Sequence, residues 1–175
     1  MFLACSRFIF FLSFLSGALV LGTSLFLEYG SGLSPCLLCY VQRFFLLGFC
    51  LTTLTACLRD RGPVGMWCFS VLSLLMALAG AASAFRQVLV QALPPEQLMF
   101  CQPELACVWH YLSPREILAM IYRGSEECAH IQWSVFNLSI PELSLLAFTG
   151  LSVLSIVQVV RVIYYQAGSR TDDVK

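Results

Sequence analysis

Charged residues are scarce in this chain. Of its 175 residues only 11% are Asp, Glu, Lys or Arg, the ten basic and ten acidic side chains cancel, and 59% of the residues are hydrophobic. A net charge of zero gives no electrostatic basis for binding nucleic acid. A mean hydropathy of +0.82 is far higher than a soluble domain of this size needs. The composition therefore predicts an integral membrane protein that does not bind nucleic acid.

Histidine is nearly absent as well. The two histidines, His110 and His130, do not stand in a paired ligand spacing, whereas a structural zinc site wants four ligands. The sequence also contains no glycine-rich phosphate loop, no Ser/His/Asp set, no internal repeat and no low-complexity tract. We therefore expect no metal site and look for the chemistry among the cysteines.

Long apolar runs occur four times. The first run, residues 8–27, has no charged residue and is long enough to cross a bilayer core of ~30 Å. A cleaved signal peptide is the competing interpretation, but its apolar core usually has only ~7–15 residues. The sequence predicts an all-α membrane protein, a single integral membrane domain (residues 1–175) built as a four-transmembrane-helix bundle, with spans at about 8–27, 37–58, 63–85 and 143–163.

The basic residues indicate how the bundle is oriented. An even number of spans places both termini on one side, and that side carries Arg7, Arg59, Arg61, Arg161, Arg170 and Lys175. The opposite side carries Arg86, Arg115 and Arg123. Because cytoplasmic loops are enriched in basic residues, we expect both termini and the short loop 59–62 in the cytoplasm. Loops 28–36 and 86–142 then lie on the outer side, where disulfides persist.

The loop 86–142 is too short for an independent enzyme domain with a large core. It contains one helix signal: Ser113, Pro114 and Glu116 suit the N-cap, N1 and N3 positions, and Gly124 suits the stop. An apolar stripe between them predicts a short helix lying on the membrane surface.

The candidate chemistry is concentrated at the start of the second span, in Pro35-Cys36-Leu37-Leu38-Cys39-Tyr40-Val41-Gln42-Arg43. Pro35 suits a helix start, and Cys36, Cys39 and Arg43 have the i, i+3, i+7 spacing that places side chains on one helix face. The helix dipole and a nearby cation both favour a thiolate at this position. Arg43 lies about 6 Å deeper than Cys39, where a guanidinium is unfavourable unless it is used.

Structural explanations of the cysteines differ in strength. A disulfide between Cys36 and Cys39 closes almost no loop and stabilises little, so redox use is the better explanation of this pair. In the loop 86–142, Cys101 and Cys128 can close a stabilising disulfide, but Cys107 is a competing partner, and spacing alone does not choose between them. The remaining cysteines are best explained as small buried hydrophobes or ordinary thiols: Cys5, Cys50, Cys57 and Cys68.

These residues resemble a known family. The stretch 35–43 is similar to the quinone-facing motif of the disulfide bond formation protein B (DsbB) family. Further similarity lies in Cys101-Gln102-Pro103-Glu104-Leu105, in the run 123–129 that ends Glu126-Glu127-Cys128-Ala129, and in residues 132–146. The resemblance covers nearly the whole chain.

The resemblance implies a bacterial inner-membrane oxidase. It implies that the protein re-oxidises a periplasmic thioredoxin-like dithiol protein of the DsbA type and passes two electrons to a membrane quinone, ubiquinone or menaquinone. Cys36 and Cys39 match the quinone-proximal disulfide pair, with Cys39 and Arg43 contacting the quinone. Cys101 and Cys128 match the loop disulfide that exchanges with the partner.

Two positions depart from the family pattern. Many members carry histidine after an arginine at the outer end of the third span, where this chain has Gln87, and glutamine near the outer end of the first, where it has Glu28. Any quinone contact from these two positions is therefore an open question. Cys107 has no counterpart in the family pattern.

The residues around Cys101 and Cys128 suggest which of the two the partner's thiolate attacks first. Cys101 lies in a proline-flanked, extended segment that can present its sulfur to a partner, whereas Cys128 follows two acidic residues. We expect the partner to attack Cys101 and Cys128 to attack Cys36 in turn, with Cys107 dispensable. A non-catalytic four-helix membrane protein, such as a transporter or assembly factor, is the alternative function. Vitamin K epoxide reductase-like proteins share the chemistry, but their CxxC usually lies toward the end of the bundle.

Overall fold

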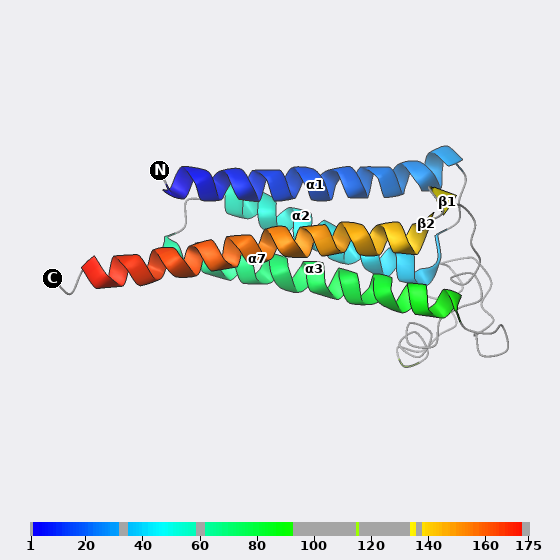
Figure 1. Cartoon of the computed structure of the whole chain (residues 1–175). Coiled ribbons are helices and arrows are strands. Elements are labelled where there is room, and N and C mark those ends of the chain that lie inside the picture. The colour runs from blue at the N-terminus through cyan, green and yellow to red at the C-terminus, as the bar shows by residue number, and fades with distance from the viewer. Residues whose placement is uncertain are drawn as a thin grey trace.

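The structure, a computed structural model, describes residues 2–31, 35–58, 62–92, 115, 134–135 and 138–172. Within them the chain forms four long helices and one short strand pair (Figure 1). The elements are α1 (Phe2–Ser31), α2 (Leu37–Leu58), α3 (Pro63–Gln91), β1 (Ser134–Val135), β2 (Leu138–Ser139) and α7 (Ile140–Asp172). Each helix contains a stretch long and apolar enough to cross a membrane. The predicted four-helix membrane bundle is confirmed.

The helices extend beyond the predicted spans. α3 continues past Arg86 to Gln91, and α7 begins at Ile140 and includes Glu142 in its first turn. The predicted spans stop at a charge, but a charged side chain near a helix end can reach the interface while the helix continues. Of the predicted surface helix only Arg115 lies within the described residues, where it is helical and exposed.

The four helices lie lengthwise along one another (Figure 1), and their contacts close in the order α1, α2, α3, α7. α3 makes its largest contacts with α7 and α2, while α1 packs on α2 and, less extensively, on α7. The start of α1 and the end of α7 lie at one end of the bundle (Figure 1). The other end is formed by the end of α1, the start of α2, the end of α3 and the start of α7; we call it the cysteine end, because Cys36 and Cys39 lie there.

The interior is filled by large side chains set against small ones. The buried cluster consists of Leu46, Phe49, Ala77, Ala84, Phe148 and Leu151. Gly80 of α3 lies directly against the ring of Phe148 of α7, so that a Cβ at Gly80 would be 2.1 Å from Phe148 Cε1. Small residues let membrane helices approach closely, and this contact sets the spacing of α3 and α7.

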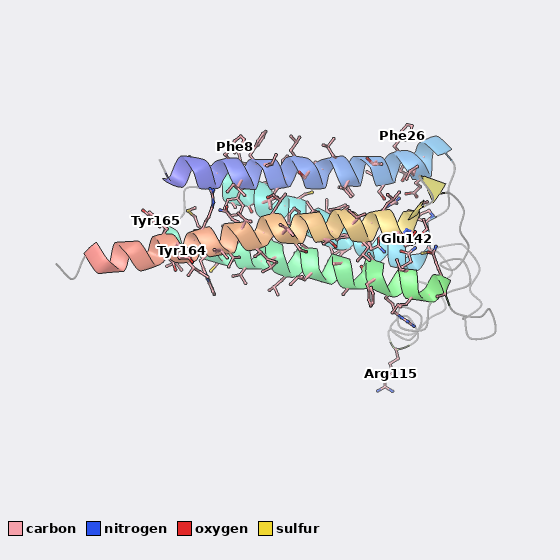
Figure 2. The ribbon with its side chains drawn as sticks, viewed as in Figure 1. Phe8, Phe26, Arg115, Glu142, Tyr164 and Tyr165 are labelled. Carbon is pink, nitrogen blue, oxygen red and sulfur yellow. The ribbon has the colours of Figure 1, made fainter. Side chains whose placement is uncertain are left out.

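The outer surface of the bundle is apolar. Phe8 and Phe26 of α1 are 63% and 69% exposed and point away from the other helices (Figure 2). Leu75 of α3 and Val153 of α7 are also more than half exposed, at 57% and 54%. Side chains of this kind, exposed along helices of membrane-spanning length, are what a lipid bilayer covers.

Hydrogen bonds secure the start of α7 at the cysteine end. β1 and β2 pair antiparallel, with Ser134 opposite Ser139. The backbone N–H of Ser139 donates to Glu142 Oε2 at 2.6 Å, which is one half of a capping box, and Glu142 lies at this start in Figure 2. Ser139 Oγ also donates to Gln91 Oε1 at 3.1 Å. The start of α7 is thereby joined to the end of α3.

Candidate functional site

The turn that starts α2 fixes the two cysteines. Pro35 and Cys36 directly precede the helix. The carbonyl of Cys36 accepts hydrogen bonds from the backbone N–H groups of Cys39 (3.0 Å) and Tyr40 (3.3 Å). This first turn brings the two cysteine side chains onto the same face, as their spacing predicts.

The two sulfurs are in contact as thiols. Cys36 Sγ and Cys39 Sγ lie 3.4 Å apart and are not joined by a disulfide. Cys36 is buried and Cys39 is half-buried. The structure therefore describes the reduced pair, and the predicted Cys36–Cys39 disulfide stays a prediction for the oxidised protein.

Gln87 of α3 lies against both sulfurs. Its Nε2 is 3.4 Å from Cys36 Sγ and 3.4 Å from Cys39 Sγ, at hydrogen-bonding distance for sulfur. Its Oε1 accepts a hydrogen bond of 2.6 Å from Gln42 Nε2, and the Cys39 thiol lies 3.8 Å from the same oxygen. The residue that departs from the family pattern thus directly contacts the cysteine pair.

Arg43 is held by residues of α1. Its Nε donates to Ser24 Oγ and its Nη2 to the Ser24 carbonyl, both at 2.8 Å, and its Nη1 forms an ion pair with Glu28. The Tyr40 hydroxyl donates to Glu28 at 3.5 Å, and the Arg43 guanidinium lies 5.7 Å from the centre of the Tyr40 ring. The side chains of Arg43 and Glu28 remain 15% and 18% exposed. Glu28 therefore balances the charge of Arg43 and helps to orient its guanidinium, while the side chain stays partly exposed.

The sequence did not reveal which side chains contact the cysteine pair or Arg43. The ion-pair partner of Arg43, Glu28, lies on another helix, α1. The available signal was an acidic residue, Glu28, directly after an uncharged run of 20 residues, opposite an otherwise unexplained arginine in the next helix. Gln42 lies within the motif 35–43 but was given no role, although it is only 5% exposed.

The other predicted site residues, Cys101 and Cys128, lie outside the described residues, as does Cys107. Farther from the cysteine end along α2 and α3 lie three more cysteines whose side chains the structure describes: Cys50, Cys57 and Cys68. Cys50 packs against Gly17, where an added Cβ would be 2.9 Å from its sulfur, and Cys68 is exposed on α3. They are separate from the Cys36–Cys39 pair.

The chemistry that this arrangement supports is thiol–disulfide exchange. Cys36 and Cys39 are adjacent and can be joined as a disulfide, Gln87 offers amide N–H groups to a thiolate, and Arg43 supplies positive charge four residues further along α2. Exchange needs a thiolate and an accessible sulfur, and Cys39 is only half-buried, so its sulfur is not fully enclosed by the bundle.

Comparison with known proteins identifies the relatives of the chain. Residues 6–158 match the family model described as disulfide bond formation protein DsbB. Disulfide bond formation protein B of Stutzerimonas stutzeri (strain A1501) is 38% identical over 159 residues, which cover 91% of this chain and 98% of the relative. Disulfide bond formation protein B 1 of Pseudomonas aeruginosa is 42% identical over the same shares of both chains. Disulfide bond formation protein B of Hahella chejuensis is 37% identical, covering 83% and 88%. No solved structure matches the chain.

Proposed function

The chain belongs to the disulfide bond formation protein B (DsbB) family, a family of membrane proteins of disulfide bond formation, and on this premise we propose that it is a quinone-dependent protein-disulfide oxidoreductase. It takes two electrons from a periplasmic thioredoxin-like dithiol protein of the DsbA type and passes them to a membrane quinone. The multi-pass bundle fits the bacterial inner membrane. We further propose cytoplasmic termini, periplasmic cysteines and a single domain over residues 1–175.

One observation carries the proposal. Cys36 and Cys39 are in contact at the start of a membrane-spanning helix, and Arg43 on the same helix is oriented by α1 without being fully buried. A structural disulfide would need neither an oriented cation nor an amide donor at its sulfurs. A redox pair that exchanges electrons with a lipid-soluble acceptor needs both.

The residues present fit a quinone. When bound, a quinone would accept two electrons and two protons and so become a quinol. Arg43 would donate a hydrogen bond to a ring oxygen and stabilise negative charge there, because its guanidinium has more N–H groups than Ser24 and Glu28 occupy. Of the two cysteines, Cys39 is the less buried and the nearer to Arg43 along the helix, so it would be the one to contact the quinone. Phe44, which is 69% exposed beside Arg43, supplies apolar surface of the kind that a prenylated ring requires.

The partner's electrons enter through the loop pair. In the first exchange a thiolate of the reduced partner attacks Cys101, the Cys101–Cys128 disulfide breaks, and Cys128 leaves as a thiolate. Cys128 then attacks Cys36, and Cys39 leaves as the thiolate. The partner's second thiolate then attacks the partner sulfur bound to Cys101, so that the partner leaves as a disulfide and Cys101 as a thiolate. The Cys101 thiolate attacks Cys128, which re-forms the loop disulfide, breaks the Cys128–Cys36 bond and releases Cys36 as a thiolate. Overall the partner loses two electrons and the Cys36–Cys39 pair gains them.

The direct test is quinone reduction by the purified full-length protein. With a reduced thioredoxin-like partner, the absorbance of ubiquinone or menaquinone should fall as the partner becomes oxidised, one quinone per disulfide. Cys68→Ser, which changes an exposed thiol remote from the pair, should retain this activity. If the protein inserts and folds but neither quinone is reduced, it is not an oxidase, and a non-catalytic membrane protein becomes the better interpretation.

The loop assignment has its own test. Cys101→Ser and Cys128→Ser should each abolish activity, whereas Cys107→Ser should retain it. Cys128→Ser should trap the partner as a mixed disulfide on Cys101, identified by mass spectrometry of the joined peptides. Partner found on Cys107, or activity lost in Cys107→Ser, would contradict this order.

A further inference from the structure

Two glutamines are buried together at the cysteine end. Gln42 of α2 is 5% exposed and Gln87 of α3 is 4% exposed. A buried amide is unfavourable unless its donors and acceptors are paired. Here the two side chains pair with each other, through Gln42 Nε2 and Gln87 Oε1 at 2.6 Å, and the rest of the Gln87 amide is directed at the cysteine sulfurs.

The bond to Gln42 determines which way the Gln87 amide faces. A glutamine side chain has a donor end and an acceptor end, which are nearly equal in shape. With Gln42 donating to Oε1, the NH₂ group of Gln87 must face Cys36 and Cys39, and it lies 3.4 Å from each sulfur. If Gln87 alone were reversed, two NH₂ groups would oppose each other and the amide oxygen would face the sulfurs. While Gln42 presents its own NH₂ group to Gln87, as it does in this structure, it favours the donor orientation of Gln87.

A donor at this position distinguishes the two redox states. Reduction of the Cys36–Cys39 disulfide breaks the S–S bond, adds two electrons, and leaves one thiolate and, with one proton, one thiol. A thiolate accepts hydrogen bonds strongly, because bonds to charged groups are the strong ones, whereas a disulfide sulfur is a poor acceptor. The Gln87 amide consequently stabilises the reduced state more than the oxidised state.

We propose that Gln42 and Gln87 form an amide relay that makes the Cys36–Cys39 disulfide more strongly oxidising: Gln87 holds the thiolate, and Gln42 is a positioning residue that acts through Gln87. The relay rests on the proposed function for its purpose, since the loop dithiol supplies the two electrons in that scheme. A more oxidising disulfide accepts those electrons more completely. The relay itself concerns only the equilibrium of this pair.

The test measures that equilibrium without quinone or partner. Full-length protein carrying Cys101→Ser and Cys128→Ser is equilibrated with mixtures of reduced and oxidised dithiothreitol, and differential alkylation followed by mass spectrometry gives the oxidised fraction of Cys36 and Cys39. Gln87→Met keeps the length of the side chain and removes the amide. It should make the disulfide harder to reduce by about tenfold in the exchange constant, or about 30 mV.

Gln42→Met should shift the constant in the same direction by a smaller factor, about threefold, because the freed Gln87 amide still donates part of the time. The double variant should equal Gln87→Met alone, since Gln42 acts only through Gln87. Gln87→His should have an exchange constant closer to that of the unchanged protein than Gln87→Met has, because a ring N–H can donate. Gln91→Met is the matched control: Gln91 is one turn further along α3, is bonded to Ser139, and should leave the constant unchanged.

An unchanged constant in Gln87→Met, or an equal effect of Gln42→Met with and without Gln87, would overturn the relay. A purely structural role would lower the unfolding temperature of these variants and leave the constant where it was. If the relay fails while the intact protein reduces quinone, only this inference is wrong. If the relay holds while no quinone is reduced, the fault lies in the proposed function.

Discussion

At the cysteine end, buried polar side chains bond from one helix to another, whereas in the middle of the bundle they bond back to their own helix. Gln42 reaches Gln87 of α3, and Arg43 reaches Ser24 and Glu28 of α1. In the middle, the hydroxyls donate to backbone carbonyls three or four residues earlier: Thr53 to Phe49, Ser73 to Ser70, Ser152 to Phe148 and Ser155 to Leu151.

This difference in hydrogen bonding distinguishes a region that holds the helices together from a region that positions reactive groups. A hydroxyl bonded within its own helix satisfies its polar group but says nothing about where the next helix lies, so association in the middle depends on packing of the kind that Gly80 and Phe148 make. A side chain bonded across helices fixes one helix relative to another and directs the remaining donors. We therefore expect substitutions in the middle to change stability and those at the cysteine end to change chemistry.

Cysteine-to-serine substitutions should show the largest difference in activity between the cysteine end and the middle of the bundle. Cys39→Ser removes a sulfur of the proposed redox pair and should lower quinone reduction by at least about a thousandfold, while the protein still inserts. Cys50→Ser changes a buried thiol in the middle, where the new hydroxyl can bond a carbonyl of its own turn as Thr53 does. Steady-state rates of both variants would check this, and a comparable loss in Cys50→Ser would remove the distinction.

Glycine substitutions should show the opposite pattern. Gly80→Ala places a Cβ 2.1 Å from Phe148 Cε1, and the overpacked α3–α7 contact should lower stability by about 1–3 kcal/mol. Gly22→Ala is the control, because nothing lies within 4 Å of the added carbon. Thermal unfolding in detergent measures both. The Cys36–Cys39 exchange constant of Gly80→Ala should stay unchanged below its unfolding transition, and a shift there would show that the middle also governs the chemistry.

The sequence determines the helices and the cysteine motif more clearly than the contacts between helices. Uncharged runs predicted four membrane helices, and the spacing of Cys36, Cys39 and Arg43 predicted a shared helix face. Neither depends on how a helix is rotated about its axis. Both follow from properties that a single segment carries: its hydropathy, its length and its 3.6-residue period.

The contacts of Gln87 and Glu28 depend on that rotation. A soluble helix reveals its buried face through an apolar stripe, but membrane helices are apolar on both the lipid-facing and the interior side. Phe8 and Phe10 of α1 show the difficulty, since one is 63% exposed and the other 2% exposed although the residue type is the same. No apolar stripe therefore indicated that Gln87 faces the cysteines, and the signal for the Glu28–Arg43 contact was the position of two charges near the ends of consecutive apolar runs, not a helical pattern.

Arg43 allows the chemical and structural contributions at the cysteine end to be separated. Arg43→Ala removes the proposed donor for quinone and also leaves Glu28 without its ion-pair partner. The Michaelis constant for quinone should rise about tenfold, and stability should fall by about 1–2 kcal/mol. Adding Glu28→Gln removes the stranded charge, so the double variant should recover stability but not quinone affinity. Recovery of both would mean that Arg43 is structural only.

A pair of serines offers the smallest and most discriminating comparison. Ser24 and Ser152 are both polar residues of apolar helices, but Ser24 Oγ accepts a 2.8 Å hydrogen bond from Arg43 Nε of another helix, whereas Ser152 Oγ donates to Phe148 of its own. Ser24→Ala should leave the unfolding temperature nearly unchanged, because Glu28 and the Ser24 carbonyl still hold the guanidinium. With one of its restraints lost, Arg43 is less well oriented, and the Michaelis constant for quinone should rise about twofold to threefold.

Ser152→Ala is the control. It should leave the Michaelis constant for quinone unchanged and change the free energy of unfolding by no more than about 0.5 kcal/mol, because a helix-internal bond of this kind adds little. Equal effects of the two alanines on the Michaelis constant would mean that bonding across helices does not distinguish the cysteine end from the middle.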